Sequence, residues 1–504
     1  MQLISERKFK FVSRLASQSG FVTLGNVFTL FVGLPFQIYL ANELGAAQLG
    51  ALGLFEVVAQ TVGSIFSFGL GFLLVRFIPQ YVELGQNRHV KYLLGKVFFL
   101  TVCTGFVAAN LVMFGDAILL YWMPDLYPYI DLFSLTALMA FLGMLNGISQ
   151  QALRSFFDIR YMILISSFLQ LLIKVGITVF LLGLGWELFG YLFAVVVSSA
   201  VALIAMLWRI YVNINRMDRT DELISTETKK SWLSYSLTMY GIYILGVLGL
   251  FAERFLLAGM VNVAAVGVLL VIRQLFLILQ VPLTIITTGV APLFAAAYSR
   301  GDLDEIEHIY HIATDWGCRL GFPLLLFLLL FGGEVLSIYG EEFYKTGQLP
   351  FALLVIGQVF NLVVGPVGAM LEMVGHEKSV FRFNAVSSAI GFGFMFAFIP
   401  LFGLVGVAIG ITFSMLYVNV IELVTMRNKL KIKWWSGCYA RLSMPIGVVL
   451  CVLLLVKFSG VDVGGPWRLV TLLFMSYAIF IGVYSCAGMS NQDREIIAIL
   501  RGKE

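Results

Sequence analysis

Two residues of opposite charge stand at matching positions inside hydrophobic segments, where their chemistry could serve an anionic ligand. Glu56 follows Gly50 by six residues, and Arg273 follows Gly267 by the same six, at positions that a faint internal repeat aligns. A charge at the middle of a bilayer costs at least about 2.5–3.5 kcal/mol unless it faces a cavity or a partner. Two interpretations remain open. Either Arg273 binds an anionic phosphate, which a guanidinium fork matches, and Glu56 modulates or gates that site, or the two side chains form a buried pair that latches two halves of the protein.

A second cation lies deep inside a hydrophobic segment. Lys174 stands about thirteen residues after the start of its segment. In one interpretation, its long side chain carries the ammonium to the membrane surface or to a helix carbonyl. In the other, the ammonium lines a polar passage through the protein. Gln170 stands one helical turn earlier on the same face, which favours the passage. Glu253, near the outer end of another segment, is a further candidate for coupling or gating.

Three arginines, Arg76, Arg154 and Arg382, stand near the segment ends that we expect to face the cytoplasm. Each either anchors its segment or makes the first contact with an anionic lipid headgroup. Uncharged polar residues in or beside the segments are expected to form hydrogen bonds between helices or to contact a bound ligand. They are Asn26, Asn146, Gln150, Gln358, Asn361 and Asn384.

The elements that position these residues are long hydrophobic segments. Hydrophobic residues make up 60% of the chain and charged residues 12%, and the mean hydropathy is +0.93. A membrane-spanning helix needs roughly 20 apolar residues, and its backbone must satisfy its own hydrogen bonds in lipid. We therefore predict about fourteen membrane-spanning helices. They cover residues 15–40, 48–75, 90–113, 130–153, 161–183, 187–210, 233–256, 264–296, 313–336, 347–374, 379–400, 404–426, 440–458 and 466–487.

The basic residues predict the orientation of these helices. About 27 of the 33 Lys and Arg residues fall in the N-terminal tail, in every second gap and in the C-terminal tail. Because basic residues near spans are retained on the cytoplasmic side, both termini are predicted to be cytoplasmic. Lys174 and Arg273 lie within segments. The exceptions in the opposite gaps are Arg254, Lys345, Lys457 and Arg468.

The internal repeat predicts the domain organisation. Gly33-Leu34 corresponds to Gly249-Leu250, and Leu49–Leu52 corresponds to Val266–Leu269, at offsets near 217 residues. Each repeat contains six segments and begins on the same side, which is typical of parallel repeats related by an axis along the membrane normal. We predict an all-α integral membrane protein with two pseudo-symmetric six-helix lobes and a cleft between them for alternating access. The predicted parts are an N-terminal lobe at 1–212, a cytoplasmic linker at 213–232, a C-terminal lobe at 233–430, and two further helices with a tail at 431–504.

Several classes of protein are disfavoured by what the sequence lacks. It contains no Walker A loop and no G-x-S-x-G elbow, and His308 and His311 have no carboxylate in a H-E-x-x-H arrangement. The five cysteines form no C-x-x-C pair. The net charge of +4 follows from the positive-inside bias and implies no nucleic-acid partner. We therefore expect neither an enzyme nor a bound cofactor or metal.

Three stretches resemble a known family. They are VRFIPQYVELGQ after the second segment, VAPLFAAAYSRGDLDEI after the eighth, and GEEFYKTGQLPFALLVIGQVFN leading into the tenth and continued by EMVGHEKSVFRFN. With the fourteen segments, they make the chain similar to the polysaccharide transporters, or O-antigen-type flippases. These belong to the superfamily that also contains the lipid II flippase and the multidrug and toxin extruders.

The resemblance implies a V-shaped helical fold and a substrate. Such a protein would move an oligosaccharide linked to undecaprenyl pyrophosphate across the bacterial inner membrane, for surface polysaccharides such as lipopolysaccharide O-antigen or exopolysaccharide. Its cleft is typically cationic, which agrees with Arg273 and Lys174, and Asn361 would contact sugar hydroxyls. Glu56 would couple transport to a proton or sodium gradient. A polysaccharide polymerase and chain-length machinery, together with membrane lipids, would be its partners.

Three alternatives are weighed against this interpretation. A multidrug extruder would generally carry an acidic residue in its first span, yet no Asp or Glu occurs between Arg14 and Glu43. A membrane-integral polymerase or ligase would present a large outer loop with catalytic Arg or His residues, which the sequence lacks. A structural membrane protein would not need charges at mid-depth on related helices.

Overall fold

The computed structural model describes residues 2–215, 251–435, 438–461 and 463–487, with single positions between 232 and 249. Side chains are described from residue 21 onward, apart from residues 23 and 438. The chain divides into two compact units, Met1–Gly267 and Val268–Glu504. The predicted lobe and linker boundaries remain predictions.

The described residues are almost entirely helical, as the sequence predicts. Twelve of their helices are long and apolar enough to cross a membrane. The stretch Leu24–Phe66 joins the first two predicted segments, and the seventh, at 233–256, lies largely outside the described residues. In several of these helices, most residues of the most apolar stretch are not covered by other parts of the protein. Only 17% of the residues in that stretch are buried in Ile159–Gly183, and 22% are buried in Val367–Phe402. Apolar helices that expose their side chains in this way are suited to lipid.

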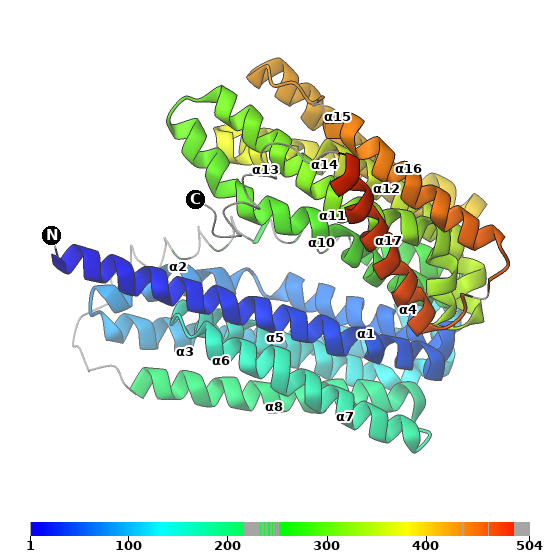
Figure 1. Cartoon of the computed structure of the whole chain (residues 1–504). Coiled ribbons are helices and arrows are strands. Elements are labelled where there is room, and N and C mark those ends of the chain that lie inside the picture. The colour runs from blue at the N-terminus through cyan, green and yellow to red at the C-terminus, as the bar shows by residue number, and fades with distance from the viewer. Residues whose placement is uncertain are drawn as a thin grey trace. The chain divides into compact units, whose positions relative to one another are not determined.

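The first unit is a bundle in which α1, α3, α5 and α8 pack alongside one another (Figure 1). Its helices are α1 (Gln2–Phe66), α2 (Leu70–Glu83), α3 (Asn87–Phe114), α4 (Asp116–Trp122), α5 (Phe133–Ser155), α6 (Ile159–Ile163), α7 (Gln170–Gly183) and α8 (Glu187–Asn215), with a 3₁₀ turn η1 (Pro124–Leu132) and a π-helical turn η2 (Leu164–Leu169). Helix α10 (Val263–Ser299) begins in this unit and continues into the second.

Two breaks interrupt the first predicted pair of segments; the first lies within the predicted gap at 41–47, and the second was not predicted. Helix α1 is kinked within that gap at Gly45, which has non-helical backbone angles with φ 68°. It then ends at Phe66, although the predicted second segment extends to residue 75. Phe68 and Gly69 have positive φ there, and the Ser236 hydroxyl donates to the Phe68 carbonyl at 2.7 Å. The side-chain hydrogen bond satisfies a backbone carbonyl that the broken helix leaves without its usual partner.

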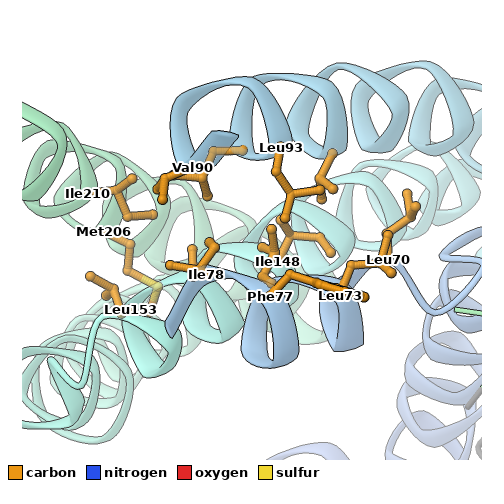
Figure 2. Close-up of a cluster of buried hydrophobic side chains, with 14 of the residues drawn as sticks. Leu70, Leu73, Phe77, Ile78, Val90, Leu93, Ile148, Leu153, Met206 and Ile210 are labelled. Atoms are coloured by element: carbon orange, nitrogen blue, oxygen red, sulfur yellow. The ribbon is translucent and has the colours of Figure 1, made fainter. Parts of the chain in front are cut away.

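Buried apolar side chains from α2, α3, α5 and α8 hold one end of the first unit together (Figure 2). Leu74, Ile78 and Val90 are completely buried in this cluster. Leu70, Leu74 and Ile78 recur at every fourth position of α2, which places them on one face of the helix. The short helix α2 is thereby fixed against α3 and α5.

A close crossing of two helices lies elsewhere in the first unit. A Cβ atom added to Gly50 would lie 1.9 Å from the Val263 carbonyl oxygen, and one added to Gly267 would lie 2.0 Å from that of Ala46. Gly50 and Gly267, like Ala46 and Val263, are 217 residues apart. The two repeats therefore make a symmetric contact in the structure. At each glycine, the absence of a side chain lets the backbone of the other repeat pack closely.

The second unit contains α10 and the helices that follow it. They are α11 (Leu303–Ser337), α12 (Glu341–Val364), α13 (Val367–Leu371), α14 (Glu377–Phe402), α15 (Leu404–Thr425), α16 (Cys438–Phe458) and α17 (Pro466–Ala487), with π-helical turns η3 (Glu372–His376) and η4 (Met426–Leu430). Asp302 caps α11, accepting a hydrogen bond from the Glu305 amide at 2.9 Å. Gly365, at φ 74°, and Pro366 separate α12 from α13. Helices α16 and α17 pack on each other and on α11.

Two of the basic residues that break the orientation rule have acidic partners. Lys345 pairs with Glu341 at 2.6 Å on the surface, and the Lys457 ammonium lies 2.7 Å from the Glu334 carboxylate in a partly buried contact between α16 and α11. Lys457 also donates to the Leu330 carbonyl.

We expect Lys457→Met to lower the free energy of unfolding by about 1–3 kcal/mol, because it leaves the Glu334 carboxylate without its cation in a partly buried place. The double variant Lys457→Met with Glu334→Leu should recover most of that loss. Thermal unfolding of the purified protein in detergent measures both. A single variant as stable as the wild type would show that the pair contributes nothing.

Candidate functional site

A cavity of about 410 Å³ lies within the first unit, among α1, α2, α3, α5 and α8. Among the described residues, its wall is built mainly from small, amide and hydroxyl residues with a few larger apolar side chains, and Glu56 is the one ionisable residue in it. The residues that line it are Glu56, Ala59, Gln60, Gly63, Ser64, Ser67, Gly69, Gly71, Phe72, Thr101, Met139, Ala140, Gly143, Met144, Gly147, Ile148, Gln151, Val195 and Ser199. Its volume is in the range of small-molecule sites.

The Glu56 carboxylate is held by two residues of neighbouring helices. The Tyr191 hydroxyl of α8 donates to its Oε1 at 3.1 Å, and the Tyr191 side chain is 4% exposed. Lys174 of α7 lies close enough to Glu56 to interact with it electrostatically. The Lys174 ammonium stands 5.8 Å from the centre of the Tyr191 ring and 5.7 Å from that of Phe36, which places the cation over two aromatic faces. The two charges therefore compensate each other within one unit.

Amide and hydroxyl groups extend this polar cluster beside the cavity. The Gln170 amide donates to the Ser199 hydroxyl at 3.2 Å, and Ser199 lines the cavity. The Asn146 amide donates to the Ser199 carbonyl at 3.0 Å, which joins α5 to α8. This bond confirms the predicted role of Asn146 between helices. The buried Asn146 Oδ1 accepts no hydrogen bond from the described residues, so an acceptor remains open beside the cavity.

A smaller cavity of about 220 Å³ lies within the second unit, between α10 and α12. Asn361 lines it, and its predicted contact with a ligand stays a prediction. Gln358 lines it too and donates to the Leu279 carbonyl of α10 at 3.4 Å, which confirms a predicted hydrogen bond between helices. The described residues that line it are Gln280, Leu283, Thr284, Thr287, Thr288, Gln358 and Asn361.

The charged candidates lie at several different places. Arg273 is half-buried on α10 in the second unit, two helical turns before Gln280. Arg76 and Arg382 are exposed on α2 and α14, and Arg154 is exposed in the last turn of α5. None of these arginines lines either cavity.

Glu253 is buried, with 5% of its surface exposed, and it also lines neither cavity. The structure therefore brings together Glu56 and Lys174, and places Asn361 at a second cavity. It leaves the role of Glu253 in coupling as a prediction.

Sequence reasoning missed the partners of Glu56 and the threonine face of α10. Tyr191 lies 135 residues from Glu56, and nothing in its own segment marks it, because tyrosine is ordinary at a membrane helix. Gln280, Thr284 and Thr287 did carry a signal. Their spacing of four and three residues places three polar side chains on one face of an otherwise apolar helix.

Comparison with known proteins identifies both family and fold. The family model described as "Polysaccharide biosynthesis protein" matches residues 15–297, which is more than half of the chain. Searching the curated proteins gave no match. Among solved structures, the chain resembles the lipid II flippase MurJ in an inward closed conformation, with a TM-score of 0.68 and 12% identity, covering 92% of this chain and 98% of that one.

Two further solved structures share the fold. An inward-facing multidrug resistance MATE family transporter of the MOP superfamily has a TM-score of 0.63 and 18% identity, covering 80% of this chain and 94% of that one. A MOP superfamily transporter from Pyrococcus furiosus has a TM-score of 0.53 and 18% identity, covering 83% of this chain and 95% of that one. At these identities, the likeness shows that the chain has the fold of MOP superfamily transporters.

Proposed function

Because the chain belongs to the family of polysaccharide biosynthesis proteins, we propose that it is a flippase for an undecaprenyl-pyrophosphate-linked oligosaccharide. It acts by alternating access in the bacterial inner membrane, with both termini in the cytoplasm. The family match over residues 15–297 carries this proposal. The fold supports it, since one solved structure with this fold is a lipid II flippase, whose cargo is itself lipid-linked.

The proposed roles follow from charge and position. Arg273 binds the pyrophosphate, because a guanidinium inside a span is suited to a doubly charged group that must leave water. Arg76, Arg154 and Arg382 make first contacts with the headgroup at the cytoplasmic leaflet. Lys174 balances the charge of Glu56. A polysaccharide polymerase and chain-length machinery receive the cargo on the other side.

Deleting the gene tests the proposal. The deletion strain should lose its surface glycan and accumulate undecaprenyl-linked oligosaccharide on the cytoplasmic face, and the intact gene should reverse both effects. Extraction of the lipid-linked sugars with glycan analysis measures this. Normal surface glycan, with no accumulation, would contradict the proposal.

A multidrug extruder is the second candidate, and one observation favours it. Among the described residues that line the first-unit cavity, Glu56 alone is ionisable. Because Lys174 does not line that wall, the charge that faces the cavity is negative and suits an organic cation better than a phosphate. In that case the deletion strain would become sensitive to cationic drugs and keep its glycan. Drug susceptibility measured on the same strain separates the two functions.

Glu56 is the proposed coupling site for a proton or sodium gradient. The Glu56→Gln variant keeps the acceptor for Tyr191 but neither releases a proton nor binds a cation. We expect glycan export to fall at least about tenfold and to lose its dependence on the gradient, because a positioned group that transfers protons typically contributes at least that much to a rate. Export assayed in cells with an ionophore measures this. Glu43→Gln, an exposed carboxylate on α1, is the matched control and should export normally. Gradient-dependent export by Glu56→Gln would rule out this role.

A further inference from the structure

The cavity between α10 and α12 in the second unit is lined by neutral polar groups. Six of the seven described residues that line it carry an amide or a hydroxyl group, and Leu283 is the seventh. None of them is ionisable. The first-unit cavity differs, because Glu56 contributes a charge to its wall.

These polar groups lie inside helices that are long and apolar enough to span a membrane. Helix α10 runs from Val263 to Ser299, and Gln280 lies near its middle. Thr284 and Thr288 of the same helix are exposed to the cavity side rather than packed in the protein. Lipid offers no hydrogen bonds to an amide or a hydroxyl group. The cavity therefore suits a polar occupant.

The hydrogen bonds within the lining show which groups remain available. The Thr284 hydroxyl donates to the Gln280 carbonyl at 2.9 Å, and the Thr288 hydroxyl donates to the Thr284 carbonyl at 2.8 Å. Their oxygens keep lone pairs that can accept. The Asn361 amide donates to Gln358 Oε1 at 3.3 Å, so the Asn361 carbonyl oxygen can also accept.

Gln280 and Thr287 supply the donors. Within the described part of the chain, the Gln280 amide and the Thr287 hydroxyl have no hydrogen-bond partner among the side-chain contacts. The wall thus presents both donors and acceptors without net charge. A phosphate would find no cation here, and an acyl chain would leave these groups unsatisfied. Sugar hydroxyl groups both donate and accept, which matches the wall.

We propose that this cavity is a binding subsite for an uncharged glycosyl unit of the cargo, an inference that rests on the proposed function. Arg273 stands seven residues before Gln280, so both lie on the same face of α10 about 10 Å apart along the axis. A pyrophosphate held at Arg273 would place the attached sugar toward the cavity.

The repeat gives an independent reason to regard this cavity as a built feature. The residues 217 positions before Gln280, Thr284, Thr288 and Asn361 are Gly63, Ser67, Gly71 and Met144. All four line the first-unit cavity. Each unit therefore has a cavity at the corresponding place. At three of these positions the first unit has two glycines and a methionine, whereas the second unit has side chains with amide or hydroxyl groups.

Binding to the full-length protein in nanodiscs tests the proposal. The probes are undecaprenyl pyrophosphate alone and the same lipid carrying N-acetylglucosamine, N-acetylgalactosamine or galactose. For at least one sugar, the wild type should bind the glycosylated lipid about tenfold tighter than the bare lipid, as one or two added hydrogen bonds would give. The double variant Thr284→Val with Thr287→Val should lose that gain and bind the bare lipid unchanged.

Two controls keep the test specific. Thr471→Val removes a hydroxyl that is likewise exposed and bonded to a carbonyl four residues earlier, at 2.8 Å, but that lies on α17 outside the cavity. It should keep the full gain, and so should Thr284→Ser with Thr287→Ser, which retains both hydroxyl groups. If no sugar improves binding to the wild type, or the valine variant keeps the gain, the subsite is refuted. Binding of the bare lipid would then still support the proposed function, whereas failure of all four lipids to bind would contradict both.

Discussion

Replacing Arg273 with alanine should abolish the export of surface glycan, although the protein still inserts into the membrane. Arg273 is half-buried on α10, inside a membrane-spanning helix of the second unit. Removing the cation from a buried phosphate contact costs about 2–5 kcal/mol, which corresponds to a loss of roughly 30-fold to several thousandfold. Surface glycan in a complemented deletion strain, together with the amount of protein in the membrane fraction, measures this effect.

Two companion variants define what Arg273 does. Arg273→Lys keeps the charge and loses the planar fork, so we expect export between that of the wild type and that of the alanine variant. Arg441→Ala removes an exposed arginine from α16 and should leave export normal. Wild-type glycan levels in Arg273→Ala cells would contradict the proposed binding site.

The interpretation that Glu56 and Arg273 latch two halves together is tested by exchanging them. If the charges pair directly, Glu56→Arg combined with Arg273→Glu should recover what each single variant loses. We expect no recovery, because Glu56 already has Tyr191 and Lys174 as partners within its own unit. Restored export in the double variant would support the latch.

The second large effect is expected at the glycine crossing. Gly50→Ala places a methyl group 1.9 Å from the Val263 carbonyl oxygen, and Gly267→Ala places one 2.0 Å from that of Ala46. A backbone carbonyl cannot rotate away as a side chain can, so the helices must separate. We expect each variant to lose about 1–3 kcal/mol or more of unfolding free energy, and the yield of folded protein to fall. Thermal unfolding and size-exclusion profiles in detergent measure this.

Gly95→Ala is the matched control for the crossing. Gly95 also lies within a membrane-spanning helix, but a Cβ atom there meets nothing within 4 Å. Alanine favours helix over glycine by as much as about 1 kcal/mol, so Gly95→Ala should be neutral or stabilising. Equal stability of Gly50→Ala and Gly95→Ala would show that the close approach is not needed.

Hydropathy predicted most of the fold because each membrane-spanning helix requires a long run of apolar residues that is visible in the local sequence. The predicted segments 187–210 and 264–296 correspond to Glu187–Asn215 and Val263–Ser299. The resemblance to polysaccharide transporters is confirmed by the family match. The break at Phe66 was missed, because the residues around Gly69 are as apolar as the helix before them. It depends on the backbone of Phe68 and on the Ser236 hydroxyl, which is remote in sequence.

The candidate site was only partly predictable, for a physical reason. Placing a charge inside a bilayer is unfavourable in free energy, so a charged residue in an apolar segment is easily noticed, as Glu56, Lys174 and Arg273 were. The chain does not reveal which of them meet. Glu56 lies beside Lys174 because α1, α7 and α8 pack together, and such packing depends on many weak contacts.

The compensation between Glu56 and Lys174 has a consequence for the distance over which the first-unit cavity acts on a solute. From a distance the two opposite charges cancel, so the cluster draws in neither cations nor anions. Only a solute that is already inside the cavity meets one sign of charge, because Glu56 lines its wall and Lys174 does not. The first-unit cavity would therefore sort solutes by charge after they enter it, and not by drawing them in from a distance.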